Sequence, residues 1–185
     1  MTSVEPLRER LVSAGVALLE EVGAGELGLR AIAREAGVSH GAPRRYFPTH
    51  NSLLAAIAAR GYADLRAEID AVQGDSAPVR VQRTCLAYID FATARPEMFT
   101  LMFRHDLLAG AGENLRVNTT LPMFARWRAL VAECVPDGAD ERALSLWTQL
   151  HGIAVVVGNR SIEAIAPGTD IEALVARAVA RHLAV

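Results

Sequence analysis

The sequence predicts an all-α fold of about nine helices, with a three-helix unit at the N-terminus and a longer helical region after it. Apolar residues recur every three or four positions almost throughout, and the alternation of β-branched residues typical of strands is absent. The 185 residues include 51% hydrophobic and 22% charged side chains. This composition indicates a globular chain and excludes the disordered, collagen-like and coiled-coil classes.

Four helices are expected in the N-terminal part, at about 7–22, 29–36, 39–45 and 50–72. Gly37 follows the second helix, where a glycine provides a left-handed cap. Ser39 is placed to cap the third helix. Either Thr49 or Asn51 can cap the long fourth helix.

Five further helices are expected, at about 78–94, 96–108, 113–135, 139–158 and 170–184. Prolines and glycines between these spans act as stop or first-turn signals. Pro122 either kinks its helix or marks the true start after Thr119 or Thr120. Thr169 and Glu172 have the spacing of a capping box at the start of the last helix.

The charge of the chain is unevenly distributed. Nineteen basic residues, all arginine, stand against 21 acidic ones, and the net charge of -2 argues at first against a nucleic-acid partner. Residues 36–63, however, contain three arginines and no acid. Because a guanidinium binds phosphate in a bidentate manner, this segment is compatible with DNA.

The chain has no sign of export, of a metal or of catalysis. Cys85 and Cys134 form no CxxC pair, which favours a reducing compartment without a disulfide framework. An acidic N-terminus and the lack of a long apolar run predict a cytoplasmic protein without a membrane partner. No nucleophile elbow, phosphate loop or metal cluster appears, so we expect no catalytic residue, no metal, no cofactor and no enzyme activity.

Residues 29–47 read as a helix, a tight turn and a second helix. This is the arrangement of a helix-turn-helix, whose second helix enters the major groove of DNA. Ala33 and Ala36 allow the two helices to cross closely. Ser39 and Gly41 fall at the start of the second helix, where backbone N–H groups favour a phosphate.

The segment Ile32–Ser39, with Gly41 and Tyr46–Phe47 after it, resembles the N-terminal domain of tetracycline-repressor-like (TetR/AcrR) regulators. The resemblance covers about residues 5–60. It implies a homodimeric repressor that binds a double-stranded DNA operator and is released by a small, largely apolar effector.

The resemblance also implies two functional domains along the chain. Residues 1–50 would form the helix-turn-helix DNA-binding domain, and 51–185 the helical ligand-binding and dimerisation domain, with the fourth helix as the link. The predicted DNA contacts are Arg30, Ser39, His40, Gly41, Arg44, Arg45, Tyr46 and His50.

Three residues depart from the family pattern. Arg44 replaces the usual tyrosine, His50 the usual lysine, and Gly28 the usual serine or threonine. Arg44 can still bind phosphate, or guanine through O6 and N7. His50 predicts a weaker and pH-sensitive phosphate contact, because an imidazole carries a full charge only when protonated.

Methionine and aromatic residues concentrate in the second half of the chain. Trp147 and His151 share one helical face, and with Gly152 they resemble the Trp, His-Gly signature of one C-terminal subgroup. The residues predicted to contact an effector are Met98, Met102, Phe103, Met123, Phe124, Trp127, Trp147 and His151. The alternative for most of them is an ordinary core.

The last two helices carry apolar faces that could form a four-helix bundle with a second copy. The predicted interface residues are Leu144, Leu150, Val155, Ile171, Leu174, Val175, Ala178 and Val179. The alternative is packing within one chain.

Two other functions stay open at this level. One is an all-α small-molecule-binding or enzymatic domain with a vestigial helix-turn-helix. The other is a regulator without an effector, controlled only by its own abundance. Binding of duplex DNA with a steep salt dependence separates the first alternative from a DNA-binding regulator.

Overall fold

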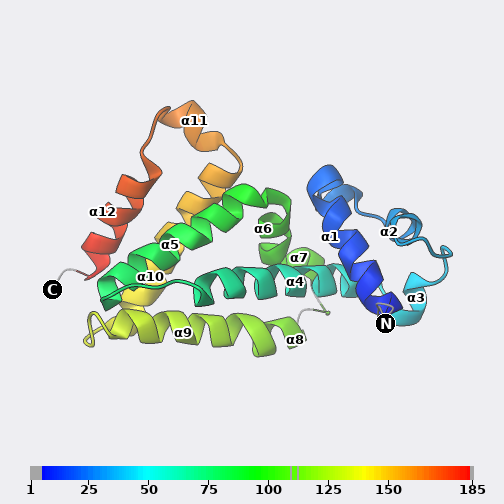
Figure 1. The fold of residues 1–185 in the computed structure, drawn as a ribbon, viewed down its shortest axis with the longest axis horizontal. Coiled ribbons are helices and arrows are strands. Elements are labelled where there is room, and N and C mark those ends of the chain that lie inside the picture. The colour runs from blue at the N-terminus through cyan, green and yellow to red at the C-terminus, as the bar shows by residue number, and fades with distance from the viewer. Residues whose placement is uncertain (1–5, 109, 112, 184–185) are drawn as a thin grey trace. The chain divides into compact units, whose positions relative to one another are not determined.

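The computed structural model describes residues 6–108, 110–111 and 113–183, and every regular element in these ranges is a helix (Figure 1). In chain order the elements are α1 (Leu7–Glu26), α2 (Leu29–Glu35), α3 (Pro43–Tyr46), α4 (His50–Asp70), α5 (Ala77–Ala94), α6 (Pro96–Phe103), α7 (His105–Leu108), α8 (Glu113–Leu115), the π-helical η1 (Arg116–Thr120), α9 (Leu121–Ala132), α10 (Ala139–Gly158), α11 (Ser161–Ile165) and α12 (Ile171–Leu183). The predicted all-α fold is confirmed.

The helices form two compact units. The first contains residues up to Ala63 together with Glu97–Thr119, and the second contains Asp64–Pro96 and the residues from Thr120 onward. Helix α4 is continuous across the boundary. The functional division predicted at residue 50 stays a prediction, because the units describe packing and not role.

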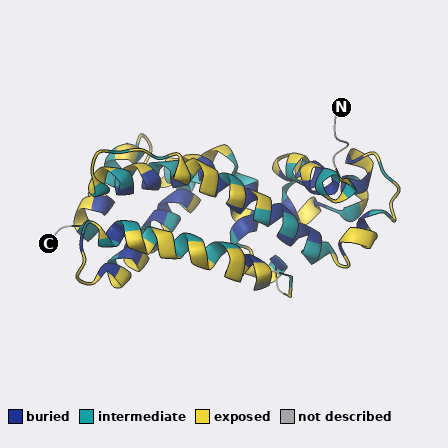
Figure 2. Ribbon diagram, turned by 60° about the horizontal axis from the view of Figure 1, so that its bottom comes forward, coloured by how far each residue is buried: buried dark blue, intermediate teal, exposed yellow. Residues whose placement is uncertain are grey.

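The core of the first unit lies where α1 and α2 pack together and where the first turns of α4 are buried (Figure 2). Leu11, Ile32 and Ile57 are fully buried there. Gly15 lies so close to the Ile57 side chain that a Cβ atom would clash with it. A side chain at position 15 would therefore require the Ile57 side chain to move.

Helix α6 is held in the first unit at both of its ends. At its start, the Glu20 carboxylate of α1 accepts hydrogen bonds from the backbone N–H groups of Glu97 (3.3 Å) and Met98 (3.0 Å). At its end, the Tyr62 hydroxyl of α4 donates to the carbonyl oxygen of Met102 across 2.8 Å. The sequence did not predict that α6 packs with the N-terminal helices.

In the second unit, α10 packs against α5, α9 and α12. The backbone of Gly158 on α10 approaches the carbonyl oxygen of Ala92 on α5 too closely to admit a Cβ atom. At the other end of α10, Arg142 donates to the carbonyl oxygen of His182 across 2.9 Å and so satisfies an acceptor at the end of α12.

Helix boundaries confirm part of the expectation. Thr49 caps α4, because its hydroxyl oxygen accepts the Ser52 N–H (3.0 Å) while the Ser52 hydroxyl accepts the Thr49 N–H (3.1 Å). Helix α9 begins at Leu121, with Pro122 in its first turn, which agrees with a start after Thr120. The short α11 was not predicted.

One predicted helix cap and one predicted helix length were wrong. Asp170, and not Thr169, caps α12, since its carboxylate accepts the Ala173 N–H across 2.9 Å. Helix α3 has only four residues instead of the seven expected, because Pro43 has no N–H to donate to the Ser39 carbonyl oxygen, and the helix therefore begins at Pro43.

No helix in the described ranges combines the length and the apolar character needed to cross a membrane.

Candidate functional site

The helix-turn-helix consists of α2, a turn over residues 36–42 and the one-turn α3. Gly37 takes a left-handed conformation (φ +65°), as predicted. The turn then closes with a hydrogen bond from the Ala42 N–H to the Ser39 carbonyl oxygen (2.9 Å). Ser39 and Gly41 therefore lie in this turn and not at the start of a helix. The start of α3 lies at Ala42–Pro43 instead, and the contact of Ser39 and Gly41 with DNA stays a prediction.

Two buried residues hold α3 in place, and its other residues face outward. Pro43 and Phe47 are buried, whereas Arg44, Arg45 and Tyr46 between them are exposed. Within the described residues, neither Arg44 nor Arg45 has an acidic partner. Their guanidinium groups are therefore available to an anionic ligand.

The remaining predicted DNA contacts differ in exposure. Arg30, Ser39, His40 and Gly41 are exposed, whereas His50 is half-buried. The Nε2 atom of His50 lies 2.6 Å from the carbonyl oxygen of Leu27, so this ring is tied to the segment between α1 and α2. The sequence did not predict this partner.

Two arginines of α1 hold the two ends of the segment 36–47, and the sequence predicted neither of them. Arg10 donates from Nη2 to the carbonyl oxygen of Ala36 across 2.6 Å, at the end of α2. The guanidinium of Arg8 lies over the Phe47 ring, 5.2 Å from its centre, just after α3. No sequence signal marks them, because such contacts depend on how α1 crosses α2 and α3.

A cluster of aromatic residues surrounds His151 in the second unit. The Trp147 ring stacks on the imidazole (5.5 Å between centroids, 21° between planes), and Phe124 meets Trp147 edge-on at 6.1 Å. The Tyr88 hydroxyl lies 2.9 Å from Nδ1 of His151. Tyr88 was not predicted. Burial lowers the pKa of His151, so its neutral form is favoured.

The other residues predicted to contact an effector fall into two groups. Met98 and Met102 are fully buried in the first unit, where their sulfur atoms pack on Gly61, and Phe103 lies beside Tyr62. These contacts favour the core alternative for both methionines. In the second unit, Met123 is half-buried on α9.

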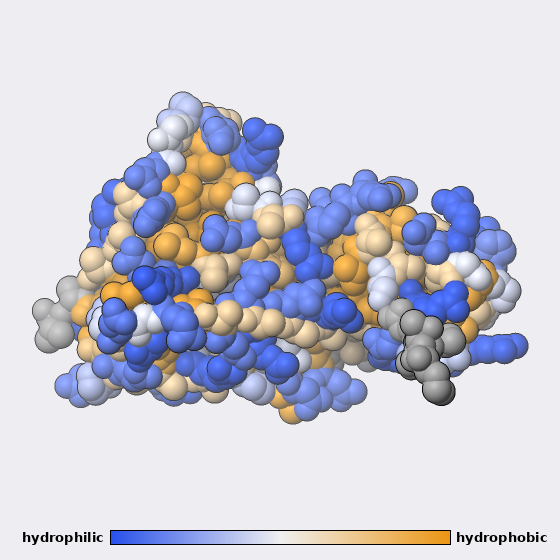
Figure 3. All heavy atoms as spheres, in the orientation of Figure 1, coloured by the Kyte–Doolittle hydropathy of each residue, from blue (hydrophilic) through white to orange (hydrophobic). Residues whose placement is uncertain are grey.

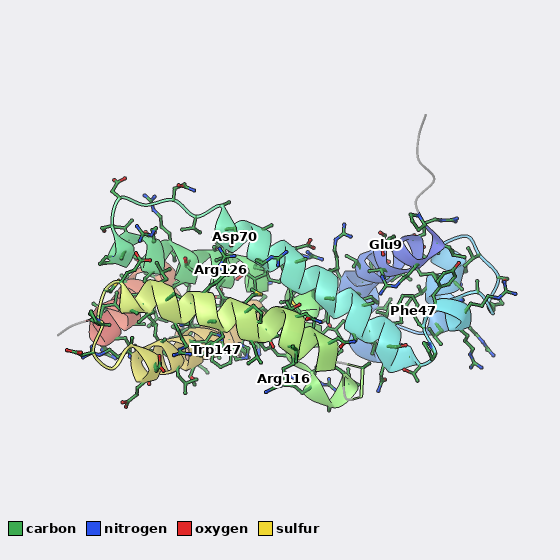
Figure 4. All side chains as sticks on the ribbon, turned by 90° about the horizontal axis from the view of Figure 1, so that it is seen from below. Glu9, Phe47, Asp70, Arg116, Arg126 and Trp147 are labelled. Atoms are coloured by element: carbon green, nitrogen blue, oxygen red, sulfur yellow. The ribbon has the colours of Figure 1, made fainter. Side chains whose placement is uncertain are left out.

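Trp127 has a partner within the second unit. Its indole Nε1–H donates to the carbonyl oxygen of Ala143 on α10 across 2.9 Å, so this donor is satisfied inside the chain. Figure 4 labels Trp147 on the neighbouring α10. It also labels Asp70 and Arg126 of α9, whose side chains form an ion pair (2.7 Å).

The apolar faces of α10 and α12 are divided between the chain's own core and its surface. Leu150, Val175, Ala178 and Val179 are buried inside the second unit, which favours for these four residues the alternative of packing within one chain. Ile171 and Leu174 are half-buried, and Leu144 and Val155 are exposed. The sequence could not tell which residues of these faces are buried, because a core within the chain and a contact with a second copy both use apolar residues.

The described residues contain no group of three or more histidine, cysteine, aspartate or glutamate side chains placed to hold a metal ion. Both cysteines are free thiols. Burial raises the pKa of the Cys85 thiol to about 12.

Family models cover most of the chain. The model for "Bacterial regulatory proteins, tetR family" matches residues 11–57, and that for "Tetracyclin repressor-like, C-terminal domain" matches residues 81–182. The chain belongs to the TetR family. It is therefore a DNA-binding transcriptional regulator, with its helix-turn-helix in the first unit.

Solved structures share the TetR fold. A protein of unknown function from Rhodococcus sp. RHA1 is 28% identical, with a TM-score of 0.82 over 98% of this chain and 96% of that one. A TetR-like transcriptional regulator from the same organism is 17% identical, with a TM-score of 0.70 over 100% and 99% of the two chains. BioQ, solved with its natural double-stranded DNA operator, is 18% identical, with a TM-score of 0.67 over 96% and 97%. No curated protein matches the sequence.

Proposed function

We propose that this TetR-family protein is a repressor that binds a palindromic operator as a homodimer and leaves it when a small, largely apolar effector binds. The observation that carries the proposal is the one-turn α3, which presents Arg44 and Arg45 to solvent without an acidic partner in the described residues. An arginine pair on a reader helix can bind phosphate oxygens or the O6 and N7 atoms of guanine.

The experiment is a titration of duplex DNA that the protein itself has selected from a random library. Arg44→Ala is expected to weaken binding by about tenfold, since loss of a good base contact costs about 1–3 kcal/mol. Arg66→Ala, which alters an exposed arginine of the second unit, is the matched control. Equal losses in both variants would contradict the proposed contact.

We place the dimer surface on the exposed side of α10. Leu144 is 52% exposed and Val155 41% exposed, and Ile165 of α11 is 78% exposed. Figure 3 shows apolar atoms gathered where α10, α11 and α12 meet. Exposed apolar groups of this size support contact with another protein surface, and a second copy supplies the second reader helix that a palindrome needs.

Two exposed valines allow a matched test of this surface. Val155→Arg is expected to convert the dimer to a monomer in sedimentation velocity. Val79→Arg, at a valine of α5 that is 39% exposed, is expected to leave the sedimentation coefficient unchanged. A dimer that persists in Val155→Arg would overturn the proposed surface.

We place the effector beside His151, Trp147 and Phe124. Stacked rings and a neutral imidazole suit an aromatic or apolar molecule with one polar group. The chain has two tryptophans, so Trp127→Phe leaves Trp147 as the only indole fluorophore. Compounds that quench this fluorescence should also release the duplex, whereas tight binding without release would contradict the effector role.

The proposed mechanism uses α4, which continues from the first unit into the second. An effector that favours one position of α4 would change the separation of the two reader helices in the dimer. Operator affinity then falls by the ratio of the effector's affinities for the two states. We further propose that the protein acts in the cytoplasm and has no catalytic activity of its own.

A further inference from the structure

The guanidinium of Arg8 lies at the end of the segment 36–47, although Arg8 belongs to α1. Its Cζ atom is 5.2 Å from the centre of the Phe47 ring, and Phe47 directly follows α3. Figure 4 marks Phe47 and Glu9, the neighbour of Arg8, at this end of the first unit. The Arg8 side chain nevertheless stays 51% exposed.

The contact with Phe47 leaves the anion-binding groups of Arg8 usable. Arg8 binds a carboxylate oxygen of Glu9 through Nη1 while its guanidinium lies over the Phe47 ring. The two contacts therefore do not compete. The ring contact also restricts the long side chain, so less conformational freedom is lost when an anion binds.

The partner of Arg8 in the structure is Glu9, at 3.0 Å between Nη1 and a carboxylate oxygen. The two residues are adjacent in the chain and both side chains are more than 40% exposed. Exposed pairs of this kind contribute little stability. A phosphate oxygen can therefore replace the carboxylate at small cost.

We propose that Arg8 is a further contact to the DNA backbone, which extends the footprint from α3 to the start of α1. The inference rests on the proposed placement of DNA on α3, because Phe47 ties Arg8 to the end of that helix. Arg8 then adds a third guanidinium to the two that α3 presents. Arg8 reads no base, so its contribution is the same for every sequence.

The test is the salt dependence of binding to the selected duplex, measured by fluorescence anisotropy for the full chain. Each phosphate contact contributes about 0.9 to the slope of log K against log salt. Arg8→Ala should reduce that slope by about 0.9 and weaken binding equally to selected and to unrelated duplexes. Arg66→Ala should leave the slope unchanged.

Glu9→Gln provides a second variant that removes no cation. Loss of the competing carboxylate should tighten binding by about threefold, within the range measured for exposed ion pairs. This gain should vanish in Arg8→Ala/Glu9→Gln. If Glu9→Gln tightens binding equally with and without Arg8, the gain comes from net charge and the Arg8 contact is wrong.

The controls separate failure of this inference from failure of the proposed operator contact. An unchanged slope in Arg8→Ala, beside a reduced affinity in Arg44→Ala, overturns the Arg8 contact alone, even if the melting temperature falls through loss of the Phe47 stack. A protein whose affinity is unaffected by Arg44→Ala contradicts the placement of DNA on α3, and the Arg8 contact with it.

Discussion

His50 and Leu27 are joined by a hydrogen bond of 2.6 Å between the imidazole Nε2 and a backbone carbonyl oxygen. A carbonyl oxygen can only accept, so Nε2 must carry the hydrogen. The bond ties the first residue of α4 to the segment between α1 and α2.

This bond predicts that His50 stabilises the first unit. A hydrogen bond of this kind contributes about 1 kcal/mol. His50→Phe cannot donate to the Leu27 carbonyl oxygen, so it should lower the free energy of unfolding in denaturant titrations by about that amount. An unchanged free energy of unfolding would show the prediction to be wrong.

Gly41→Ala is expected to raise the stability of the protein and to lower its affinity for DNA. A Cβ atom at this position meets no heavy atom within 4 Å, and its φ is not left-handed, so Gly41→Ala should fit the fold. Such substitutions stabilise a chain by about 0.4–1 kcal/mol. DNA affinity should nevertheless fall, because the added methyl group would occupy the surface that we propose faces the duplex.

Gly25→Ala is the control for this variant, since its Cβ atom also meets no neighbour. It should match Gly41→Ala in thermal denaturation and differ from it in duplex binding. Unchanged affinity in both variants would remove Gly41 from the interface.

His151 predicts a loss of stability in mild acid. Burial lowers its pKa in the folded protein, so the unfolded chain binds the proton at a higher pH than the folded chain does. The free energy of unfolding should therefore decrease as pH falls through about 6.5, the ordinary value of a histidine. Denaturant titrations at pH 7.5 and 5.5 should show a smaller decrease in His151→Gln than in the unmodified protein, and an equal decrease in both would contradict the prediction.

Glu20 predicts a local effect on α6. Its carboxylate accepts the N–H groups of Glu97 and Met98, and loss of such a cap costs about 1 kcal/mol. Glu20→Ala should lower the free energy of unfolding by about that amount and speed hydrogen exchange of the Met98 amide. Its exposed neighbour provides Glu21→Ala as a control, in which protection of that amide should persist.

Local sequence signals predicted the main features of the helix-turn-helix. Gly37 takes the left-handed turn, α2 ends one residue before its predicted limit, and Arg44 and Arg45 are exposed. Each of these depends on residues close in the chain. The sequence could also have predicted the short α3, because Pro43 has no N–H to donate to the Ser39 carbonyl oxygen.

Contacts between residues far apart in the chain could not be predicted from the sequence. Met98 and Met102 belong to an apolar run whose partner, Gly61, is an unremarkable residue inside α4. Tyr88 meets His151 from 63 positions away, and no spacing rule links them. The apolar faces of α10 and α12 look alike whether they meet each other or a second copy, so only burial separates Val175 from Val155.

The most direct test of the account is the sequence of the duplex fragments that the purified protein selects from a random library. A homodimer that reads DNA with two copies of α3 should enrich an inverted repeat whose half-sites are centred about one helical turn, or a multiple of it, apart. Arg44→Ala should relax the preference at matching positions of both half-sites. Fragments without any enriched sequence, or with an enriched site that lacks two-fold symmetry, would contradict the account.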